Sequence, residues 1–560
     1  MAETALTQAK LETRQRRVRW LDIRESLTGY LFILPAFVII GVFGLFPIVF
    51  AFYVSLHQWR ITPGAYIGLE NYQKAISHLA YVIFFIVSLV LITLAGQKLI
   101  QIYQSARQRG QTIWWLFLPA TVTALGIAQF TRFFILLLPE VLRIPERARG
   151  QVRSQELFLR LLGEAWQTPA VQEAFTLAIG ILLGGVGLFL VMSRYYPNPD
   201  HSLEYSPSLL LAVLLLGCGG VLGWYVISEV QRVYAMALQS GTKADIWAQV
   251  VTILAGFVLL LLSWLTWRRA SERSSHFSLL LHLFAAIVFA IGAWILVGEL
   301  PRIIAAGDKQ WWNGLKVTAF YSFGTVPVQI SIALLLATLL FEKIRGRALF
   351  RLIYFLPYIT PDVASAAVFR VFFSSRPTAP INNLLSQLGF EPLLWLDEPK
   401  GIFELLFGSH VGLPNWAAGP SLALVVIILY NIWSFVGYDT VVFLAGLSNI
   451  SPELYEAAEI DGAGRWAQFR YITLPLLSPT TYFLTLIAVI GTFKAFNHVW
   501  ILRSAAALGT TDTASIVIFN EFSRNTRYGY AASLSIVLLG VILVLTIINN
   551  RIARERVFYG

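Results

Sequence analysis

Polar side chains interrupt two long apolar stretches of the sequence, at residues 420–446 and 478–501. Their polar members, with the aromatic residues among them, are Asn431, Trp433, Ser434, Tyr438, Asp439, Thr485, Thr492, Lys494, Asn497 and His498. Polar groups inside an apolar span are costly in free energy, so they usually face a cavity or a partner helix. Aromatic faces that stack on sugar rings, beside amides and hydroxyls that bond sugar hydroxyls, would form a carbohydrate path. The alternative is hydrogen bonding between helices without a ligand, including an ion pair of Asp439 with Lys494.

A short polar segment lies between these two stretches. It reads Ser451-Pro-Glu-Leu-Tyr-Glu-Ala-Ala-Glu-Ile-Asp-Gly-Ala-Gly464. Ser451 suits a helix N-cap, Pro452 suits the first helical position, and the glutamates that follow suit the positive end of the helix dipole. Gly462 and Gly464 predict where the helix ends. The segment therefore predicts a short polar helix across one membrane face, or else an ordinary loop that happens to be helical.

Membrane-spanning helices must position both sets of residues. Twelve stretches have the length and apolar character needed to cross a hydrocarbon core of about 30 Å. They are 29–56, 80–100, 112–138, 172–193, 207–227, 246–267, 277–299, 315–341, 351–373, 420–446, 478–501 and 531–550. The predicted fold class is all-α, a polytopic transmembrane helical bundle.

The composition supports this class. Of the 560 residues 57% are hydrophobic and 13% charged, and the mean hydropathy is +0.67, whereas soluble proteins carry about 25% charged residues. A net charge of +11 is compatible with nucleic-acid binding, but Lys and Arg lie mainly in short connectors, where they fix orientation. Membrane lipid is thus the expected partner and nucleic acid is not. The basic N-terminus and the even number of spans place both termini in the cytoplasm.

Several chemistries lack their residues. Cys218 is the one cysteine, the seven His show no paired metal-ligand spacing, and no G-x4-G-K-[ST] phosphate loop occurs. We therefore expect no metal, no cofactor, no catalytic residue and no ATP hydrolysis on this chain. The first span is too long for a signal-peptide core and is expected to be a retained anchor.

Two connectors differ from the rest. The segment 140–168 carries five Arg and four Glu, yet the span count places it outside. It is expected to form an amphipathic surface helix, or else the stretch 113–138 does not cross. The loop 374–419 is rich in Pro, Gly and Asn, with a possible short helix at Pro380–Leu388.

The polar segment matches a known signature. Glu456-Ala457-Ala458, Gly462, Ile472, Leu474 and Pro475 fit E-A-A-x3-G-x9-I-x-L-P at every fixed position. In this the chain resembles the permease subunits of ATP-driven (ABC) importers, where the segment is a coupling helix that docks into the ATPase. The resemblance implies coupling roles for Tyr455, Glu456, Ala457, Ala458, Asp461, Gly462 and Pro475. It assigns the contact with a cationic ATPase residue to Glu456.

Other motifs make the resemblance more specific. Gly29–Pro35, Phe46-Pro47, Ile67–Tyr72, Gly346–Arg351 and Phe355–Tyr358 look like carbohydrate permeases, and Asn431–Glu456 is similar to the larger permease of the maltose importer. This implies a type I importer permease core with an inserted set of extra helices. It implies substrate-path positions at Asn431, Ser434, Phe435, Tyr438, Gly491, Lys494, Ala495, Asn497 and His498. The stretch Arg503–Gly509 departs from the T-x-G-G-P that related sugar permeases carry, which puts substrate details in doubt.

The resemblance also divides the chain. Residues 1–74 would be a cytoplasmic tail with the first transmembrane helix. Residues 311–560 would be the permease core, with five spans and the coupling helix at 451–464. Residues 75–310, with about six spans, match no known pattern and are expected to be an inserted region whose role is that of a packing scaffold, or else of a docking surface for another protein or a regulatory element.

The expected function is a permease subunit that imports a sugar or oligosaccharide across the bacterial inner membrane. Its partners would be a second permease, a dimer of cytoplasmic ATP-binding subunits and an extracytoplasmic sugar-binding protein. A polyol or glycerol-phosphate substrate is the alternative. A membrane-embedded glycosyltransferase would need a carboxylate cluster that is not seen, and an ion-driven transporter predicts inverted repeats that are not seen.

Overall fold

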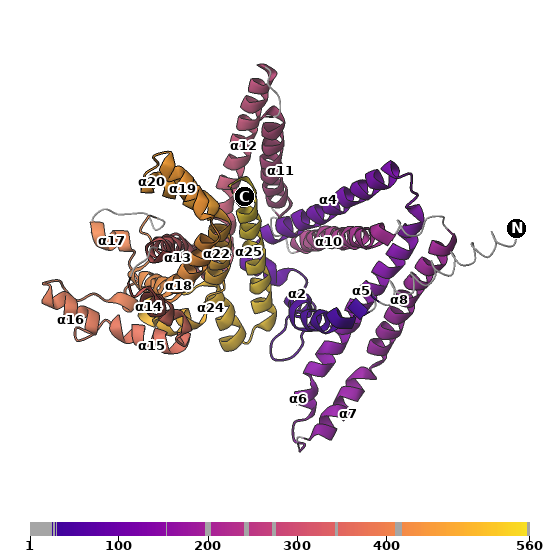
Figure 1. Cartoon of the computed structure of the whole chain (residues 1–560). Coiled ribbons are helices and arrows are strands. Elements are labelled where there is room, and N and C mark those ends of the chain that lie inside the picture. The colour runs from indigo at the N-terminus through magenta and orange to yellow at the C-terminus, as the bar shows by residue number, and fades with distance from the viewer. Residues whose placement is uncertain are drawn as a thin grey trace. The chain divides into compact units, whose positions relative to one another are not determined.

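The structure is a computed structural model that describes residues 25, 28–29, 31–152, 154–195, 203–239, 246–271, 276–341, 345–408 and 417–556. The described residues are helical, with two isolated β-bridges and no named strand (Figure 1). They form two compact units. The first comprises Met1–Gln58, Thr62–Tyr66 and Gly110–Leu210, and the second comprises Trp59–Ile61, Ile67–Arg109 and Leu211–Gly560.

The first unit contains one helical hairpin and the first span. Helical residues 31–39 continue through the π-helix η1 (Ile40–Leu45) into α2 (Phe46–Ser55). The rest comprises η2 (Trp114–Leu116), α5 (Phe117–Leu142), α6 (Ile144–Arg147), α7 (Gln155–Trp166), α8 (Pro169–Tyr195) and η3 (Leu203–Tyr205). Helices α5 and α8 pack through Phe133, Val171 and Ala174.

The connector 140–168 lies in this unit. The expected amphipathic helix is present as α7, whose N-cap Ser154 accepts a hydrogen bond from the Leu157 amide. Arg147 pairs with Glu140 across the connector. The expected span 112–138 lies inside a continuous helix over Trp114–Arg147, long and apolar enough to cross a membrane.

The second unit begins with helices of the unmatched region. These are α3 (Glu70–Ile76), α4 (Leu79–Gln108), α10 (Ser206–Gln239), α11 (Ile246–Ser271) and α12 (His276–Ala306). Leu79, Val82, Ile253 and Leu296 join α4, α11 and α12 in one core. The Ser88 hydroxyl donates to the Gly219 carbonyl over 2.7 Å, which ties α4 to α10.

The second unit continues with the helices that hold the candidate site. Their order is α13 (Lys309–Phe341), α14 (Arg347–Ile359), α15 (Asp362–Phe372), α16 (Pro380–Gln387), η4 (Trp395–Asp397), α17 (Ile402–Phe407), α18 (Leu422–Ser448), α19 (Pro452–Ile460), α20 (Arg465–Gln468), the π-helix η6 (Phe469–Thr473), α21 (Leu474–Leu476), α22 (Ser478–Phe493), α23 (Asn497–Leu502), η7 (Ala505–Ala507), α24 (Ala514–Phe519), the π-helix η8 (Asn520–Arg524) and α25 (Tyr528–Arg556). Helix α18 is central, because 72% of its most apolar window is buried. The short helix expected near 380 is present as α16.

The described residues contain ten helices long and apolar enough to cross a membrane, and up to twelve spans if each of two bent pairs is one span. This confirms the predicted fold class. Two spans differ from the straight helices expected. The expected span 351–373 is bent by 95° between α14 and α15, because Thr360 precedes Pro361 and adopts extended backbone. The expected span 478–501 follows a bend of 61° and is interrupted after Phe493.

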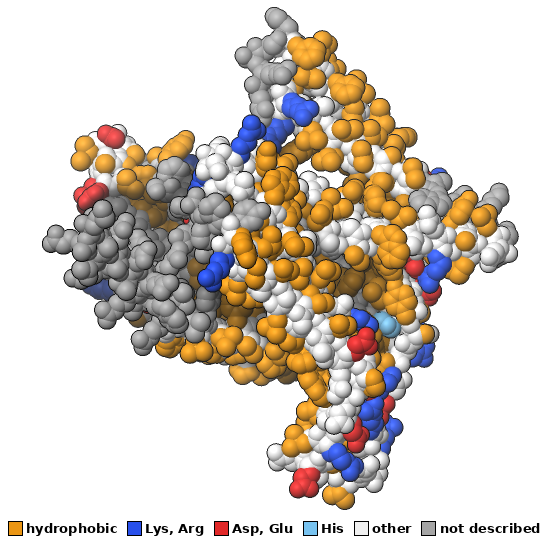
Figure 2. Space-filling model, turned by 90° about the vertical axis from the view of Figure 1, so that its right-hand side faces the viewer, with side chains coloured by type: hydrophobic (Ala, Val, Ile, Leu, Met, Phe, Trp, Pro, Cys, Tyr) orange, Lys and Arg blue, Asp and Glu red, His pale blue; other side chains and the backbone are white. Residues whose placement is uncertain are grey.

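The surface suits a hydrocarbon environment. In Figure 2 hydrophobic side chains are spread over much of the described surface, and the largest group of charged side chains lies on the lower lobe, at the level of α6 and α7 in Figure 1. Phe323 and Trp294, on two different spans, are 80% and 81% exposed. No residue is buried in the most apolar window of the helix Leu31–Ser55. Such helices match lipid on the outside and use their few polar residues inside.

Candidate functional site

A cavity of about 170 Å³ lies among α13, α14, α18, α22 and α23. Its walls are Gln329, Tyr358, Asn431, Phe435, Tyr438, Asp439, Ile487, Ala488, Gly491, Thr492 and His498. An apolar cavity of about 150 Å³ accepts a benzene molecule, so this space admits one six-membered ring. The cavity is therefore large enough for a small ligand group.

The floor and the rim of this cavity differ in character. Gln329, Asn431 and Asp439 on the floor are at most 6% exposed. Tyr358 and Ile487 on the rim are 41% and 42% exposed. The cavity is thus polar where it is buried and apolar where it meets the surface, the usual pattern of a small-molecule site.

A close helix crossing builds the aromatic wall. A Cβ on Gly437 would lie 1.8 Å from the Tyr354 carbonyl oxygen, so only glycine lets α14 approach α18 this closely. The approach brings Tyr358 from α14 against two aromatic residues of α18. Its ring stacks on Tyr438 with centroids 4.8 Å apart and meets Phe435 edge-on at 5.8 Å. Stacked aromatic faces of this kind are suited to the apolar face of a sugar ring.

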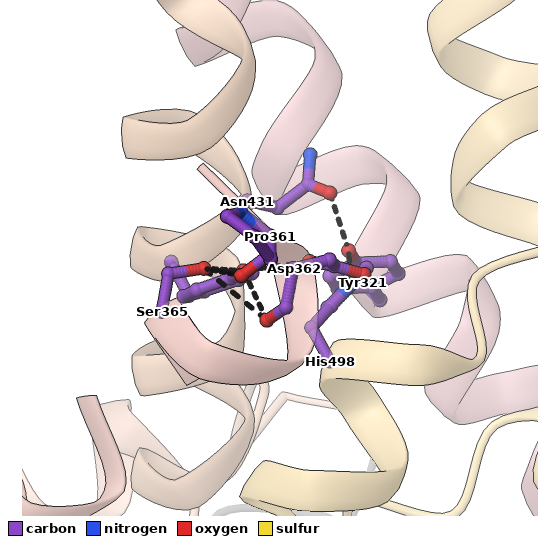
Figure 3. Close-up of polar contacts among 7 residues, drawn as sticks. Tyr321, Pro361, Asp362, Ser365, Asn431 and His498 are labelled. Atoms are coloured by element: carbon purple, nitrogen blue, oxygen red, sulfur yellow. Dashed lines mark hydrogen bonds and ion pairs between the residues drawn. The ribbon is translucent and has the colours of Figure 1, made fainter. Parts of the chain in front are cut away.

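A chain of buried hydrogen bonds forms the floor, and Figure 3 shows the end of it where Tyr321 lies between Asn431 and His498. Gln329 Nε2 donates to Asp439 Oδ2 over 2.6 Å, and Asn431 Nδ2 donates to Gln329 Oε1 over 3.0 Å. The Tyr321 hydroxyl donates to Asn431 Oδ1 over 2.8 Å and lies 2.7 Å from His498 Nε2. Because a carboxylate only accepts, each amide must point its nitrogen toward Asp439 and its oxygen away. The direction of the chain is therefore set, and His498 Nε2 is the donor to Tyr321.

A second group of contacts holds the far side of the His498 ring. His498 Nδ1 lies 3.5 Å from Asp362 Oδ2, and the Tyr430 hydroxyl donates to Asp362 Oδ1 over 2.6 Å. Ser365 Oγ lies 2.7 Å from the same hydroxyl, and the rings of Tyr430 and His498 stack with centroids 5.2 Å apart. Asp362 is the first residue of α15, directly after the bend at Pro361. The bend thus places the carboxylate where it orients a residue that lines the cavity.

The predicted substrate-path residues fall into two groups. The structure brings Asn431, Phe435, Tyr438, Gly491 and His498 together around the cavity. Ser434, Lys494, Ala495 and Asn497 are not among its lining residues. Ser434 and Ala495 are buried, whereas Lys494 and Asn497 are exposed on either side of the interruption between α22 and α23. In a straight helix through residue 501, Lys494 would share a face with Gly491, three residues before it, but α22 ends at Phe493 and that register is lost.

Within the described part of the chain no ion pair joins Asp439 to Lys494, which the sequence left open. Gln329 is instead the donor to the Asp439 carboxylate. The sequence reading also missed Tyr321, Gln329, Tyr358 and Asp362 as members of the site. The signal was present for Gln329, an uncharged amide in the middle of the apolar stretch 315–341. Among the described residues no three His, Cys, Asp or Glu side chains gather as a metal site.

The predicted polar helix is α19, which ends as its glycines indicate. Gly462 has φ +78°, and the amides of Gly462 and Ala463 donate to the carbonyls of Glu459 and Ala458 over 3.0 and 2.8 Å. This pair of bonds is the Schellman motif, which needs a left-handed residue at the position of Gly462. At the other end Ser451 is the N-cap by position, but its side chain makes no capping bond.

The predicted coupling residues lie at or near the surface of this segment. Glu456, Ala457, Asp461 and Gly462 are exposed, and Tyr455, Ala458 and Pro475 are partly buried. Tyr455 is tied down, since its hydroxyl lies 2.9 Å from Thr473 Oγ1 in η6. Helix α19 therefore presents Glu456 outward while Tyr455 anchors it to the segment that leads into α22.

Helix α19 lies in the chain between two walls of the cavity. It follows α18, which supplies Asn431 and Tyr438, and it precedes α22, which supplies Gly491. A displacement of α19 would thus be passed to both walls, through the short link after Ser448 and through the Tyr455–Thr473 contact.

Comparison with known proteins shows which family the sequence resembles. Residues 329–557 match the family described as "Binding-protein-dependent transport system inner membrane component". The arabinooligosaccharides transport system permease protein AraP of Bacillus subtilis (strain 168) is 31% identical over 46% of this chain and 78% of its own length. The lactose transport system permease protein LacF of Rhizobium radiobacter is 33% identical over 46% of this chain and 80% of its own length.

Among solved structures, a bacterial ABC transporter involved in the import of the acidic polysaccharide alginate is similar, with 25% identity over 49% of this chain and 95% of the other chain and a TM-score of 0.39. The family assignment depends on the two relatives AraP and LacF, which are more than 30% identical and matched over more than two thirds of their length. The family match itself, at residues 329–557, includes α14, α18, α19, α22 and α23. The chain belongs to the binding-protein-dependent inner-membrane transport components and is a multi-pass membrane permease subunit.

Proposed function

We propose that this permease carries a sugar or an oligosaccharide inward across the membrane, past the cavity between α14, α18 and α22. The observation that carries the proposal is the cavity itself, where a stacked aromatic pair faces a floor of amide and carboxylate groups. Sugars present apolar ring faces and many hydroxyls, and these are the two features that such walls bind. The named substrates of AraP and LacF, arabinooligosaccharides and lactose, belong to the same chemical class.

The residues we propose for the substrate path are those that line the cavity. Tyr358 and Tyr438 would hold the sugar ring, while Asn431 and Asp439 would bond its hydroxyls. His498 would complete the polar side, with its ring held by Asp362. Ser434, Lys494 and Asn497 do not line this space, so we assign them no contact with the sugar.

We infer that ATP is hydrolysed on a separate chain and that α19 is the coupling helix. Its outward face carries Glu453, Glu456 and Glu459, all exposed, a row of carboxylates for a cationic groove. Its C-terminal cap and the Tyr455–Thr473 contact hold the helix rigidly, as is needed to transmit a displacement from the ATPase to the membrane helices. Motion of the ATPase dimer would then tilt α18 and α22 and open the cavity to one side at a time.

The exposed rim supports further partners. Tyr358 and Ile487 leave the cavity open at the surface, where a second permease subunit would supply the missing wall. An extracytoplasmic binding protein would deliver the sugar, in keeping with the family description. Both termini would lie in the cytoplasm, on the same side as α19.

The unmatched region 75–310 is proposed as a packing scaffold. Two contacts at its ends support this role: the Asp308 amide donates to the Ala75 carbonyl and joins the two ends of the region, and the Tyr530 hydroxyl of α25 donates to Asp308 Oδ2 over 2.6 Å. Removing the hairpin of α11 and α12 keeps an even number of spans. We expect that variant to retain uptake with lowered thermal stability, and complete loss of uptake in a stably inserted variant would contradict a purely structural role.

The coupling proposal is tested by reversing one charge. Glu456→Lys, expressed with the partner chains, should lose co-purification of the ATP-binding subunit and lose sugar uptake. Glu391→Lys is the matched control, because Glu391 is also exposed but lies in the loop 374–419. Retention of the ATPase by the Glu456 variant would refute the coupling role. Tyr438→Ala tests the path, and unchanged sugar-stimulated ATPase kinetics would remove Tyr438 from it.

A further inference from the structure

Among the residues that line the cavity, the one charge without an opposite partner is a carboxylate. Among its eleven lining residues there is one carboxylate, Asp439, and no Lys or Arg. Asp439 is 3% exposed, so water screens its charge poorly. Any ligand group that enters the cavity must therefore tolerate this carboxylate.

The hydrogen-bond chain ends on Asp439 and leaves one of its oxygens available. Oδ2 accepts from Gln329 Nε2, and Gln329 Oε1 is already occupied by the Asn431 amide. Within the described part of the chain no donor reaches Oδ1. Because Asp439 lines the cavity, Oδ1 can accept a hydrogen bond from a ligand hydroxyl. It has no proton to donate to an anion.

The basic groups closest in the chain do not offset this charge. Any positive charge on the His498 ring is paired with the Asp362 carboxylate at Nδ1, and its Nε2 is bonded to Tyr321. Lys494 is exposed and does not line the cavity. Arg503, after α23, pairs with Asp512 over 3.3 Å.

We propose that Asp439 makes the cavity exclude anionic sugars, such as uronates and sugar phosphates, and admit uncharged ones. This inference rests on the proposed function and names its substrate class. Neutral hydroxyls donate to Asp439 Oδ1, whereas a carboxylate or phosphate placed there meets a like charge, and no lining residue offers an unpaired cation. With an effective dielectric of about 20 and a separation of about 5 Å, the repulsion weakens binding on the order of a hundredfold. The same geometry favours sugars that carry an ammonium group.

The test measures binding to this chain assembled with its second permease and ATP-binding subunits in lipid nanodiscs, without a binding protein that would impose its own selectivity. Saturation-transfer NMR, which detects weak ligands, compares methyl glucoside and methyl galactoside with their uronate counterparts and with methyl glucosaminide. In the wild type we expect the neutral glycosides to bind at least about tenfold more tightly than the uronates. The protonated glucosaminide should bind at least as tightly as the neutral sugar.

Two variants locate the effect. Asp439→Asn keeps the size and an oxygen that accepts from Gln329, so it should reduce the neutral-to-uronate ratio to within about threefold of one. Glu391→Gln removes an equal charge outside the cavity and should keep the wild-type ratio. Wild-type protein that binds uronates as tightly as neutral sugars would overturn the inference and leave the proposed function intact. So would an Asp439→Asn variant that still discriminates. If no glycoside binds at all, the proposed function fails, and the inference fails with it.

Discussion

Removing the Tyr321 hydroxyl is the sharpest test of the buried hydrogen-bond chain. Tyr321 is fully buried, and Tyr321→Phe keeps the ring while deleting the group that joins Asn431 to His498. The substitution creates no cavity larger than one oxygen atom. Any loss of stability therefore reports the hydrogen bonds and not the packing.

The size of the effect follows from the groups left behind. Asn431 Oδ1 loses its donor, and His498 Nε2 loses its acceptor. Each buried group left unpaired costs about 1–3 kcal/mol, or about 2–6 kcal/mol for the two. The adjoining cavity can supply a water molecule as a partial replacement, so a value of about 2–3 kcal/mol is expected.

The assay is thermal unfolding of the full-length protein in detergent, monitored by tryptophan fluorescence. The scan rate is held fixed, because membrane proteins often unfold irreversibly. At about 2–4 °C per kcal/mol, Tm should fall by about 4–12 °C. Tyr358→Phe is the matched control, since no hydrogen bond to the Tyr358 hydroxyl is formed within the described part of the chain, and its Tm should stay within about 1 °C of wild type. Equal Tm values for the two variants would show that the hydrogen bonds of Tyr321 contribute nothing to the stability of the protein.

Three further changes test local features of the fold. Ser421→Ala removes the N-cap bond to the Leu424 amide at 3.1 Å and should cost about 1 kcal/mol by thermal unfolding, while Ser451→Ala, whose side chain makes no cap bond, should cost less than about 0.5 kcal/mol. Gly462→Ala forces a Cβ into the left-handed region at about 1–2 kcal/mol, so amides at the end of α19 should exchange faster with deuterium; unchanged exchange would argue against a Schellman cap. Asn382→Ala removes side-chain contacts to three carbonyls and two N–H groups, so the loop 374–395 should be cut faster by protease, and an unaltered cleavage rate would contradict that role.

The cavity and α19 are connected through α18 and α22, but substitutions can test the two parts separately. Tyr321→Phe weakens the floor of the cavity without touching α19, whereas Glu456→Lys alters the outward face of α19 without touching the cavity. We expect the first to lower stability with the ATPase still bound. The second should release the ATPase with thermal stability preserved.

The sequence by itself determined the features that depend on local chain physics. Apolar length predicted the helices, because an unpaired backbone group in hydrocarbon is costly enough to force helix formation in every span. Pro452 and Gly462 predicted the start and the end of α19, since both act through their own backbone angles. The bend before Asp362 was also within reach of such a rule, because Pro361 restricts the residue before it.

Only the tertiary structure decided which polar residues form the site. Gln329 and Asp439 are 110 residues apart, and Tyr321 and His498 are 177 apart, so no local pattern pairs them. Their meeting depends on the rotation of each helix about its axis and on close crossings such as that at Gly437. These are set by packing of whole helices against one another, which the composition of a single span does not specify. For that reason the sequence indicated which spans carry the polar residues, and the packing determined that Asp439 faces the cavity with Gln329 while Lys494 does not.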